Sequence, residues 1–242
     1  MGALPTQRDP VVDERLLEDA ALGKPDALRE VLGLFYPEAY QTAVALTGRR
    51  KTGEDALATV MHQATQAAAS WQRPDEPCRW FRHHTLLAVR ARHATPPMGN
   101  DVLLGDHPSG AYRGFLVSMR KLHPQQTEAF LLHHGGGLSV RQLGIAMDCS
   151  VDAAAMHLEN AQATLRSLGR EQFLENVSRL RDVYRAIEPE GGMAVRLKRP
   201  SRLRRTWWKL RTLLPWVGML LILLAVAGLV YAGYVIWPRL DV

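Results

Sequence analysis

The chain has 242 residues, 47% of them hydrophobic, and a formal net charge of +6. The positive excess is confined to one end: residues 1–98 hold 12 basic and 12 acidic side chains, residues 99–192 hold 9 and 11, and residues 193–242 hold 9 and 1. A basic stretch of that kind suits anionic lipid headgroups, so the overall charge is no evidence for DNA binding. Two isolated cysteines, Cys78 and Cys149, exclude a disulfide framework and indicate reduced thiols.

A first helical block is predicted over residues 12–93. Apolar side chains recur at helical spacing in four segments, and Gly23 and Gly48 are typical stop signals. Asp26 is typical of an N-cap, and Pro37 is expected to interrupt the helix that follows.

The last helix of this block, which starts after Pro77, combines basic and aromatic side chains. They are Arg79, Trp80, Phe81, Arg82, His83, His84, Arg90, Arg92 and His93, with Trp71 just upstream. Such a mixture suits unstacked single-stranded bases. The alternative is that Trp80 and Phe81 belong to the core and the arginines form a solvated face.

Residues 94–110 are rich in Pro, Gly, Asn, Asp and Ser and are predicted to be a linker. A second helical block follows over residues 111–168. In it, apolar positions from Val140 to Ala146 and from Val151 to Leu165 flank the short turn Asp148-Cys149-Ser150. Two helices joined by a tight turn are typical of a helix-turn-helix, with a plain helical hairpin as the alternative.

Residues 169–188 are predicted to be an amphipathic helix or stalk. Apolar side chains recur there at steps of four and three: Phe173, Val177, Leu180, Tyr184 and Ile187. The pattern fits either a short coiled-coil seam or one helix packed on its own domain.

Residues 189–211 form a basic juxtamembrane linker, and residues 212–237 are predicted to be a transmembrane helix. No residue from Leu213 to Trp237 is charged, and about 20 apolar residues suffice to cross a bilayer core. Eight basic residues precede the span and only Arg239 follows it. Positive residues stay cytoplasmic, so the expected location is a bacterial inner (cytoplasmic) membrane, single-pass, with the N-terminal domains in the cytoplasm.

The order of the two blocks resembles bacterial RNA polymerase sigma factors of the extracytoplasmic-function class, over about residues 12–168. Gly23 to Leu28, Gly53 to Leu57 and Trp80-Phe81 are similar to region two; Leu122 to Leu132 and Gly137 to Ala146 are similar to region four. The resemblance implies an all-α fold with two small helical domains, to which the apolar run adds the predicted C-terminal transmembrane helix. It also implies core RNA polymerase and promoter DNA as partners, with a membrane or anti-sigma protein as a further candidate. The basic stretch predicts a lipid bilayer with anionic headgroups as another partner.

The resemblance also assigns candidate site residues. The DNA-binding set is Arg79, Trp80, Arg82, His83, Arg90, Arg92, Arg141, Gln142, Ser150, His157 and Asn160. The polymerase-binding set is Glu54, Asp55 and Leu57.

The sequence departs from the family at both functional surfaces. Ala58-Thr59 stands where the family carries Gln-Glu, and Leu87 and Ala91 stand where it carries Asn and Asp. The second helix of the helix-turn-helix has Ala153 to His157 where the family favours Thr-Val-Lys-Ser-Arg. Lys and Arg contacts to phosphate supply most non-specific affinity for DNA, so weak duplex binding is expected.

No enzyme signature is present, and neither a cofactor nor a metal site is expected. The adjacent pairs His83-His84 and His133-His134 point about 100° apart on a helix and do not form a shared metal site. Three functions remain: a membrane-tethered sigma factor that initiates transcription, a degenerate sigma-derived interaction module at the membrane, and a membrane-bound regulator that uses only its helix-turn-helix.

Overall fold

The computed structural model describes residues 9–92, 101–168 and 171–189. Within these ranges the regular structure is helical, without strands, which confirms the all-α prediction. The elements are α1 (Glu14–Ala21), α2 (Pro25–Thr47), α3 (Arg50–Ala67), η1 (Ala68–Ser70), α4 (Glu76–Arg90), η2 (Val102–Leu104), α5 (Gly110–Arg120), α6 (Pro124–Phe130), η3 (Leu131–Gly135), α7 (Val140–Met147), α8 (Val151–Leu168) and α9 (Phe173–Arg185).

Helix α2 differs from the sequence prediction at both of its proline positions. It begins at Pro25 instead of being capped by Asp26, because the fixed φ and missing N–H of proline suit the first helical position. It also runs through Pro37 without a break. A proline inside a helix costs about 3 kcal/mol. Phe35 and Tyr40, on either side of it, are fully buried, so core packing outweighs that cost.

The first block is a bundle in which α1, α3 and α4 all pack on α2. Aromatic side chains fill its centre: the rings of Phe35 and Phe81 stack at 5.0 Å, and Trp71 meets Phe81 at 6.1 Å. Gly53 allows α3 to approach α2 closely, because a Cβ there would lie 2.7 Å from the Cα of Val44. The start of α3 therefore lies close beside α2, and α4 packs against both helices.

The second block contains the predicted helix-turn-helix. Helix α7 begins at a capping box in which Ser139 and Gln142 satisfy each other's backbone N–H groups. It ends at Asp148, which adopts the left-handed conformation with φ 56° and ψ 52°. Gly144 lies under this turn, since a Cβ there would be 3.0 Å from the Cys149 carbonyl oxygen. The turn therefore lies at Asp148-Cys149-Ser150, as the sequence predicted.

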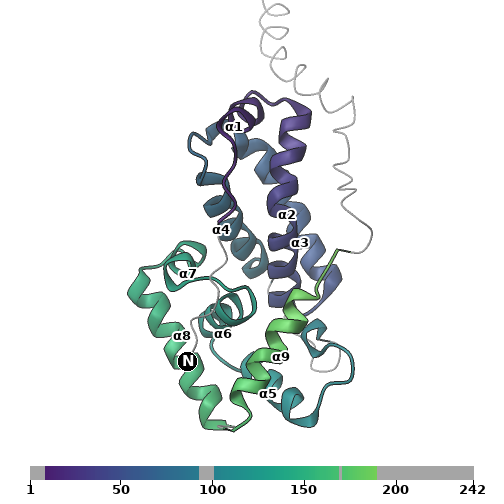
Figure 1. Cartoon of the computed structure of the whole chain (residues 1–242), viewed down its shortest axis with the longest axis vertical. Helices are drawn as coiled ribbons and strands as arrows, with labels where there is room; N and C mark the ends of the chain where they lie inside the picture. Colours follow the sequence, from purple (N-terminus) through teal and green to yellow (C-terminus); the bar gives the residue numbers. More distant parts are fainter. Residues whose placement is uncertain (1–8, 93–100, 169–170, 190–242) are drawn as a thin grey trace, which may run out of the picture. The chain divides into compact units, whose positions relative to one another are not determined.

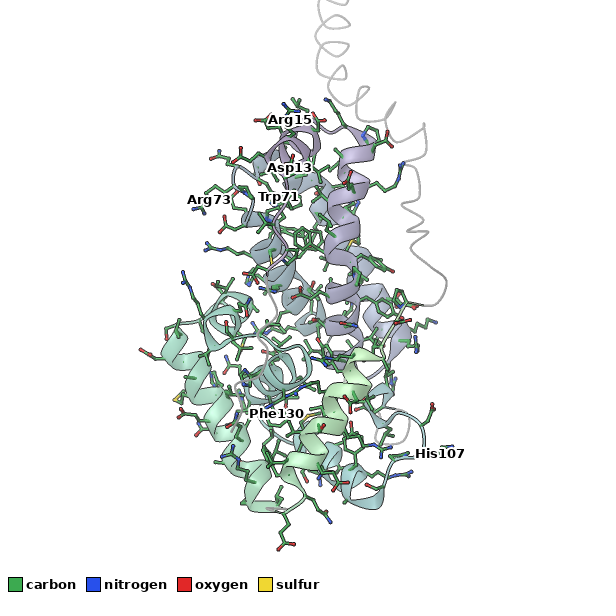
Figure 2. The ribbon with its side chains drawn as sticks, viewed as in Figure 1. Asp13, Arg15, Trp71, Arg73, His107 and Phe130 are labelled. Carbon is green, nitrogen blue, oxygen red and sulfur yellow. The ribbon has the colours of Figure 1, made fainter. Side chains whose placement is uncertain are left out.

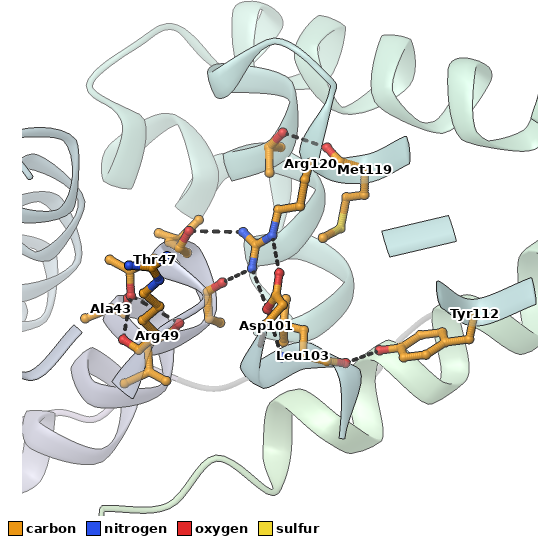
Figure 3. A network of polar contacts seen from close by, with 12 residues as sticks. Ala43, Thr47, Arg49, Asp101, Leu103, Tyr112, Met119 and Arg120 are labelled. Atoms are coloured by element: carbon orange, nitrogen blue, oxygen red, sulfur yellow. Dashed lines mark hydrogen bonds and ion pairs between the residues drawn. The ribbon is translucent and has the colours of Figure 1, made fainter. Parts of the chain in front are cut away.

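The segment predicted as a linker is structured where it is described. Residues 102–104 form η2, and Leu103 is completely buried. Asp101 accepts hydrogen bonds from Arg120, whose guanidinium also donates to the Ala45 and Leu46 carbonyls at the end of α2 (Figure 3). The composition of residues 94–110 suggested a solvated chain, but this arginine draws residues 101–104 against both blocks.

The two blocks pack together, in contrast to the two small domains that the sequence predicted. All described residues fall in one compact unit, in which α4 packs against α7 and α2 packs against α9. Figure 2 shows side chains filling the space between the ribbons, with Trp71 in the first block and Phe130 in the second. A core that extends across both blocks fixes which faces of the candidate helices remain accessible.

Helix α9 resolves the alternatives left open for residues 169–188. Its apolar side chains face the chain's own unit: Phe173, Val177, Leu180, Tyr184 and the following Ile187 are all buried. The Tyr184 hydroxyl lies 3.0 Å from Thr42 Oγ1 on α2. The repeat at steps of four and three therefore marks a helix packed on its own domain and not a coiled-coil seam.

None of the described helices is long and apolar enough to cross a membrane. The predicted transmembrane helix at residues 212–237 lies outside the described residues, and so does the basic linker apart from Pro189.

Candidate nucleic-acid and partner interface

Helix α4 carries five of the eleven predicted nucleic-acid residues, and its aromatic side chains pack on one another. Trp80 is half-buried and stacks on His84, with ring centroids 3.9 Å apart and an interplanar angle of 14°. Burial lowers the pKa of His84, against a raising contribution from its hydrogen bond to the Trp80 carbonyl. A neutral imidazole thus covers one face of the Trp80 ring, while Phe81 lies in the core.

Arg82 is a buried ion-pair residue. Its Nε donates to Glu38 Oε1 at 2.6 Å, and its Nη1 donates to Asp9 Oδ1 at 2.5 Å. Burial opposes the charge of the guanidinium, but the Glu38 and Asp9 carboxylates together raise its pKa above the ordinary value. Only 7% of the Arg82 side chain is exposed, so this predicted DNA contact is engaged inside the protein.

Two further α4 residues reach the second block. Arg90 forms a two-pronged pair with Glu128 of α6, with Nε–Oε1 at 2.9 Å and Nη2–Oε2 at 2.7 Å. Such fork-to-fork pairs are the strongest arginine–carboxylate geometry. The hydrogen bonds that Arg90 donates to Glu128 raise the pKa of Arg90 despite partial burial. His83 Nδ1 lies 3.4 Å from the Ala146 carbonyl of α7.

The remaining predicted α4 cations lie on the surface. Arg79 pairs with Asp75 at 3.1 Å, and both side chains are 47% exposed. Arg92 follows the helix and donates to the Asp55 carbonyl and to Thr59 Oγ1, at 2.8 and 2.9 Å. Arg92 thus contacts the α3 surface that carries two of the predicted polymerase-binding residues.

The predicted polymerase-binding residues divide between surface and core. Glu54 and Asp55 are exposed on α3, and Glu54 accepts a hydrogen bond from the Tyr40 hydroxyl at 3.3 Å. Leu57 is 2% exposed and belongs to the core. Glu54 and Asp55 can therefore contact another protein directly, whereas Leu57 packs in the core and holds α3 in place.

Helix α8 is the exposed second helix of the helix-turn-helix. Ser150 is exposed at its start and accepts from the Ala153 N–H at 3.1 Å, so its hydroxyl caps the helix. Farther along, His157 is half-buried and Asn160 is exposed. The outward side also presents Met156, at 51% exposed. From Val151 to Leu168 the helix has one basic residue against two acidic ones.

Two predicted DNA-binding residues lie on α7, and they differ in exposure. Arg141 is exposed. Gln142 is buried, where its side chain completes the capping box and donates to Asp9 Oδ1. Gln142 therefore serves the packing of the N-terminal segment on α7.

An open hollow of about 670 Å³ brings together predicted residues that lie far apart in the sequence. Its lining is Arg79 of α4, Arg141, Gly144 and Ile145 of α7, the turn residues Asp148, Cys149 and Ser150, and Val151 of α8. Arg82, His83 and Arg90 are not part of it. The exposed cations of α4 and α7 thus share one surface, while the other α4 cations face the protein.

Several structurally important residues could not be found by local sequence reasoning. Asp9, Glu38 and Glu128 neutralise α4 arginines, and Arg120 ties Asp101 to the end of α2. Arg82 lies 44 residues from Glu38 and 73 from Asp9. For Asp9 and Glu38, the signal that could have found them is the even balance of 12 basic and 12 acidic residues in residues 1–98, which allows extensive internal pairing.

Comparison with protein-family models and with curated proteins finds no match to this chain. Within the described residues, no group of three or more His, Cys, Asp or Glu side chains could hold a metal ion. The functional argument therefore depends on the helix-turn-helix, the surface cations and the packing between the two blocks.

Proposed function

We propose that this chain is a sigma-factor-like transcription initiation protein that binds core RNA polymerase and promoter DNA, held at the cytoplasmic membrane by a helix at residues 212–237. The observation that carries the proposal is the helix-turn-helix of α7 and α8, whose second helix is long, capped at Ser150 and accessible along one side. A helix presented in this way can enter a major groove. It follows a four-helix block that exposes Glu54 and Asp55, in the order that region two and region four have.

The composition of α8 sets how it would bind DNA. His157 and Asn160 can read base edges, but a helix with one arginine and two acidic residues holds phosphate weakly. Affinity would therefore come from the rest of the assembly. Core polymerase would supply it by fixing the helix-turn-helix over the promoter.

A second candidate function is favoured by a specific observation. The α4 residues Arg82, His83 and Arg90 are engaged by acceptors of the same chain. His83 and Arg90 contact the second block, and a surface used in this way fits an interaction module that no longer initiates transcription. In that case the outward side of α8, with Ala153, Ala155 and Met156, would contact a protein partner.

Co-purification with core RNA polymerase separates the two functions. Full-length protein in detergent should retain core polymerase from a bacterial extract. The Glu54→Lys, Asp55→Lys double variant should lose it, because both side chains are exposed on the proposed contact face of α3. Glu175→Lys together with Asp182→Lys, both exposed on α9, is the control with the same charge change and should retain polymerase. No retention by the unmodified chain would favour the interaction module.

The proposed membrane location has its own test. Eight basic residues before the apolar run, against Arg239 after it, support a cytoplasmic location for residues 1–211. A reporter that is active only in the cytoplasm should be active when fused before Met1 and silent when fused after Val242. Activity of the fusion after Val242 would contradict this topology.

A further inference from the structure

The contact between α4 and the α6–α7 side of the second block, called the seam below, includes charged and polar pairs besides apolar side chains. Arg90 meets Glu128 through two hydrogen bonds, and Asp9 accepts from both Arg82 and Gln142. The Glu128 side chain is 9% exposed and that of Arg90 is 33% exposed. The partly exposed guanidinium of Arg90 thus pairs with the buried carboxylate of Glu128 across the seam.

One buried polar atom at this contact between the blocks has no hydrogen-bond partner among the described residues. This atom is Thr85 Oγ1 of α4. It lines a cavity of about 10 Å³ together with Glu38 and Arg82 from the first block and Leu132 and Ala146 from the second. A buried polar atom without a partner has lost its hydrogen bonds to water, and that cost is recovered when water enters. Opening the contact between α4 and the second block would expose Thr85 Oγ1 to water and relieve that cost.

The opposite edge of the contact between the blocks is held differently. Arg120 donates to the Ala45 and Leu46 carbonyls, and the Tyr184 hydroxyl lies against Thr42 in a fully buried position. These contacts fix the end of α2 to α5 and α9. Release at α4 alone would swing the second block about the end of α2 and would not separate the blocks.

We propose that Arg90–Glu128 and the Asp9 contacts form a releasable latch that covers the α4 face and opens when a single-stranded polyanion takes the place of Glu128 at Arg90. This inference rests on the proposed function together with the sequence prediction that the basic and aromatic residues of α4 contact single-stranded promoter DNA. A phosphate oxygen offers Arg90 the same two-pronged geometry as a carboxylate. His83, released from the Ala146 carbonyl, would join Arg90 on the exposed face.

Spin-label distances in the full chain test the latch. One label pair, at Ala69 and Ala163, spans the two blocks, and a second, at Lys51 and Ser178, reports on the edge held by α2 and α9; all four residues are exposed. The background carries Cys149→Ser and keeps the buried Cys78. Glu128→Gln keeps the shape of the side chain but removes its charge, and the open fraction at the first pair should rise roughly tenfold. The second pair should keep its distance.

Matched variants define the outcome. Glu175→Gln removes an exposed charge from the same block and should behave as the unmodified chain. Arg90→Glu with Glu128→Arg restores an opposite-charge pair and should close the first pair again. If Glu128→Gln loses helical content, Arg90→Gln changes the more exposed partner and gives the same readout. An unchanged distance distribution in the folded variant overturns the latch.

Binding of a single-stranded oligonucleotide separates the latch from the proposed function. The oligonucleotide should lengthen the first distance in the unmodified chain and bind at least tenfold more tightly to Glu128→Gln. If Glu128→Gln opens the seam but binds no oligonucleotide, the latch stands and the assignment of α4 to single-stranded DNA fails. If the oligonucleotide binds while the distance stays unchanged, the latch is wrong and the assignment stands.

Discussion

The two helices predicted to touch nucleic acid are opposite in character. Helix α4 carries four arginine or histidine side chains among the predicted contacts, but Arg82, His83 and Arg90 face acceptors of their own chain. Helix α8 is accessible along one side, yet it carries a single arginine. Neither helix is both basic and accessible.

The difference shows that the charge of a helix and the exposure of its charged side chains are determined independently. The sequence states where arginines are, but the packing of other segments decides whether each guanidinium meets solvent or a carboxylate. Affinity for a polyanion needs both, because phosphate contacts depend on cations that can reach the ligand. Changes that release α4, or that add charge to α8, therefore test the comparison directly.

Removing the buried cation of α4 should have the largest effect. Arg82→Ala leaves Glu38 and Asp9 without their guanidinium, and breaking a buried pair in this way costs about 3–5 kcal/mol. The half-exposed Asp9 places the expected loss near the lower value. Arg79→Ala, on the same helix but in a surface pair, should cost at most about 1 kcal/mol. Denaturant unfolding of the full chain, followed by circular dichroism, measures both; equal losses would show that Arg82 behaves as a surface residue.

The fixed edge opposite α4 can be disturbed through Gly135. A Cβ at this position would lie 2.5 Å from Tyr184 Cδ2, so Gly135→Ala should push α9 away and cost about 1–3 kcal/mol. Gly114→Ala is the matched control, since a Cβ there meets nothing within 4 Å. Because alanine favours a helix interior, the control should stabilise the protein by about 0.5–1 kcal/mol. Thermal unfolding should therefore shift in opposite directions for the two variants, and a shared direction would contradict the close contact.

Low pH should lower the stability of the fold through His134, which contacts Gln162 of α8. Burial, with smaller contributions from His133, Arg181 and Arg166, lowers the pKa of His134 to about 3. Its Nε2 accepts from the Gln162 amide of α8 at 3.0 Å, while Nδ1 has no partner among the described residues.

The sign of the effect follows from which state binds the proton. The unfolded imidazole takes up a proton near pH 6.5 and the folded one only near about 3, so stability falls as the pH drops through that interval. Between pH 7 and 5 this residue alone should cost about 2 kcal/mol. His134→Gln should reduce the loss measured by denaturant unfolding at the two pH values. An equal loss in the variant would mean that other groups account for it.

The helix-turn-helix was predictable because its signals are local. The cap at Ser139 and the turn at Asp148-Cys149-Ser150 depend on neighbours within a few residues, and the structure confirms the turn. The contacts of Arg82 were not predictable, because its partners come from distant segments that only the folded chain brings together. Pro37 was misread for the same reason: the local cost of a proline was visible, but the burial that offsets it was not.

The smallest expected effect concerns the charge of α8. Ala155 and His157 stand where the resembled family usually carries Lys and Arg, and both are only partly buried, so longer side chains can extend from the helix. The Ala155→Lys, His157→Arg variant should bind duplex DNA about 1–2 kcal/mol more tightly, with a steeper dependence on salt.

Fluorescence anisotropy at two salt concentrations measures this gain, and the control is Thr164→Lys with Ser167→Arg. These two exposed residues lie near the far end of α8, so their charges add to the helix away from the turn that leads a recognition helix into the groove. A larger gain for the variant at residues 155 and 157 would support a helix that docks by its first half. Equal gains would indicate attraction without a defined orientation. No gain in duplex binding by a folded variant would favour the interaction-module function, in which α8 contacts a protein. In that case the bulky cations at positions 155 and 157 should weaken the protein contact, because they disturb close packing against the partner.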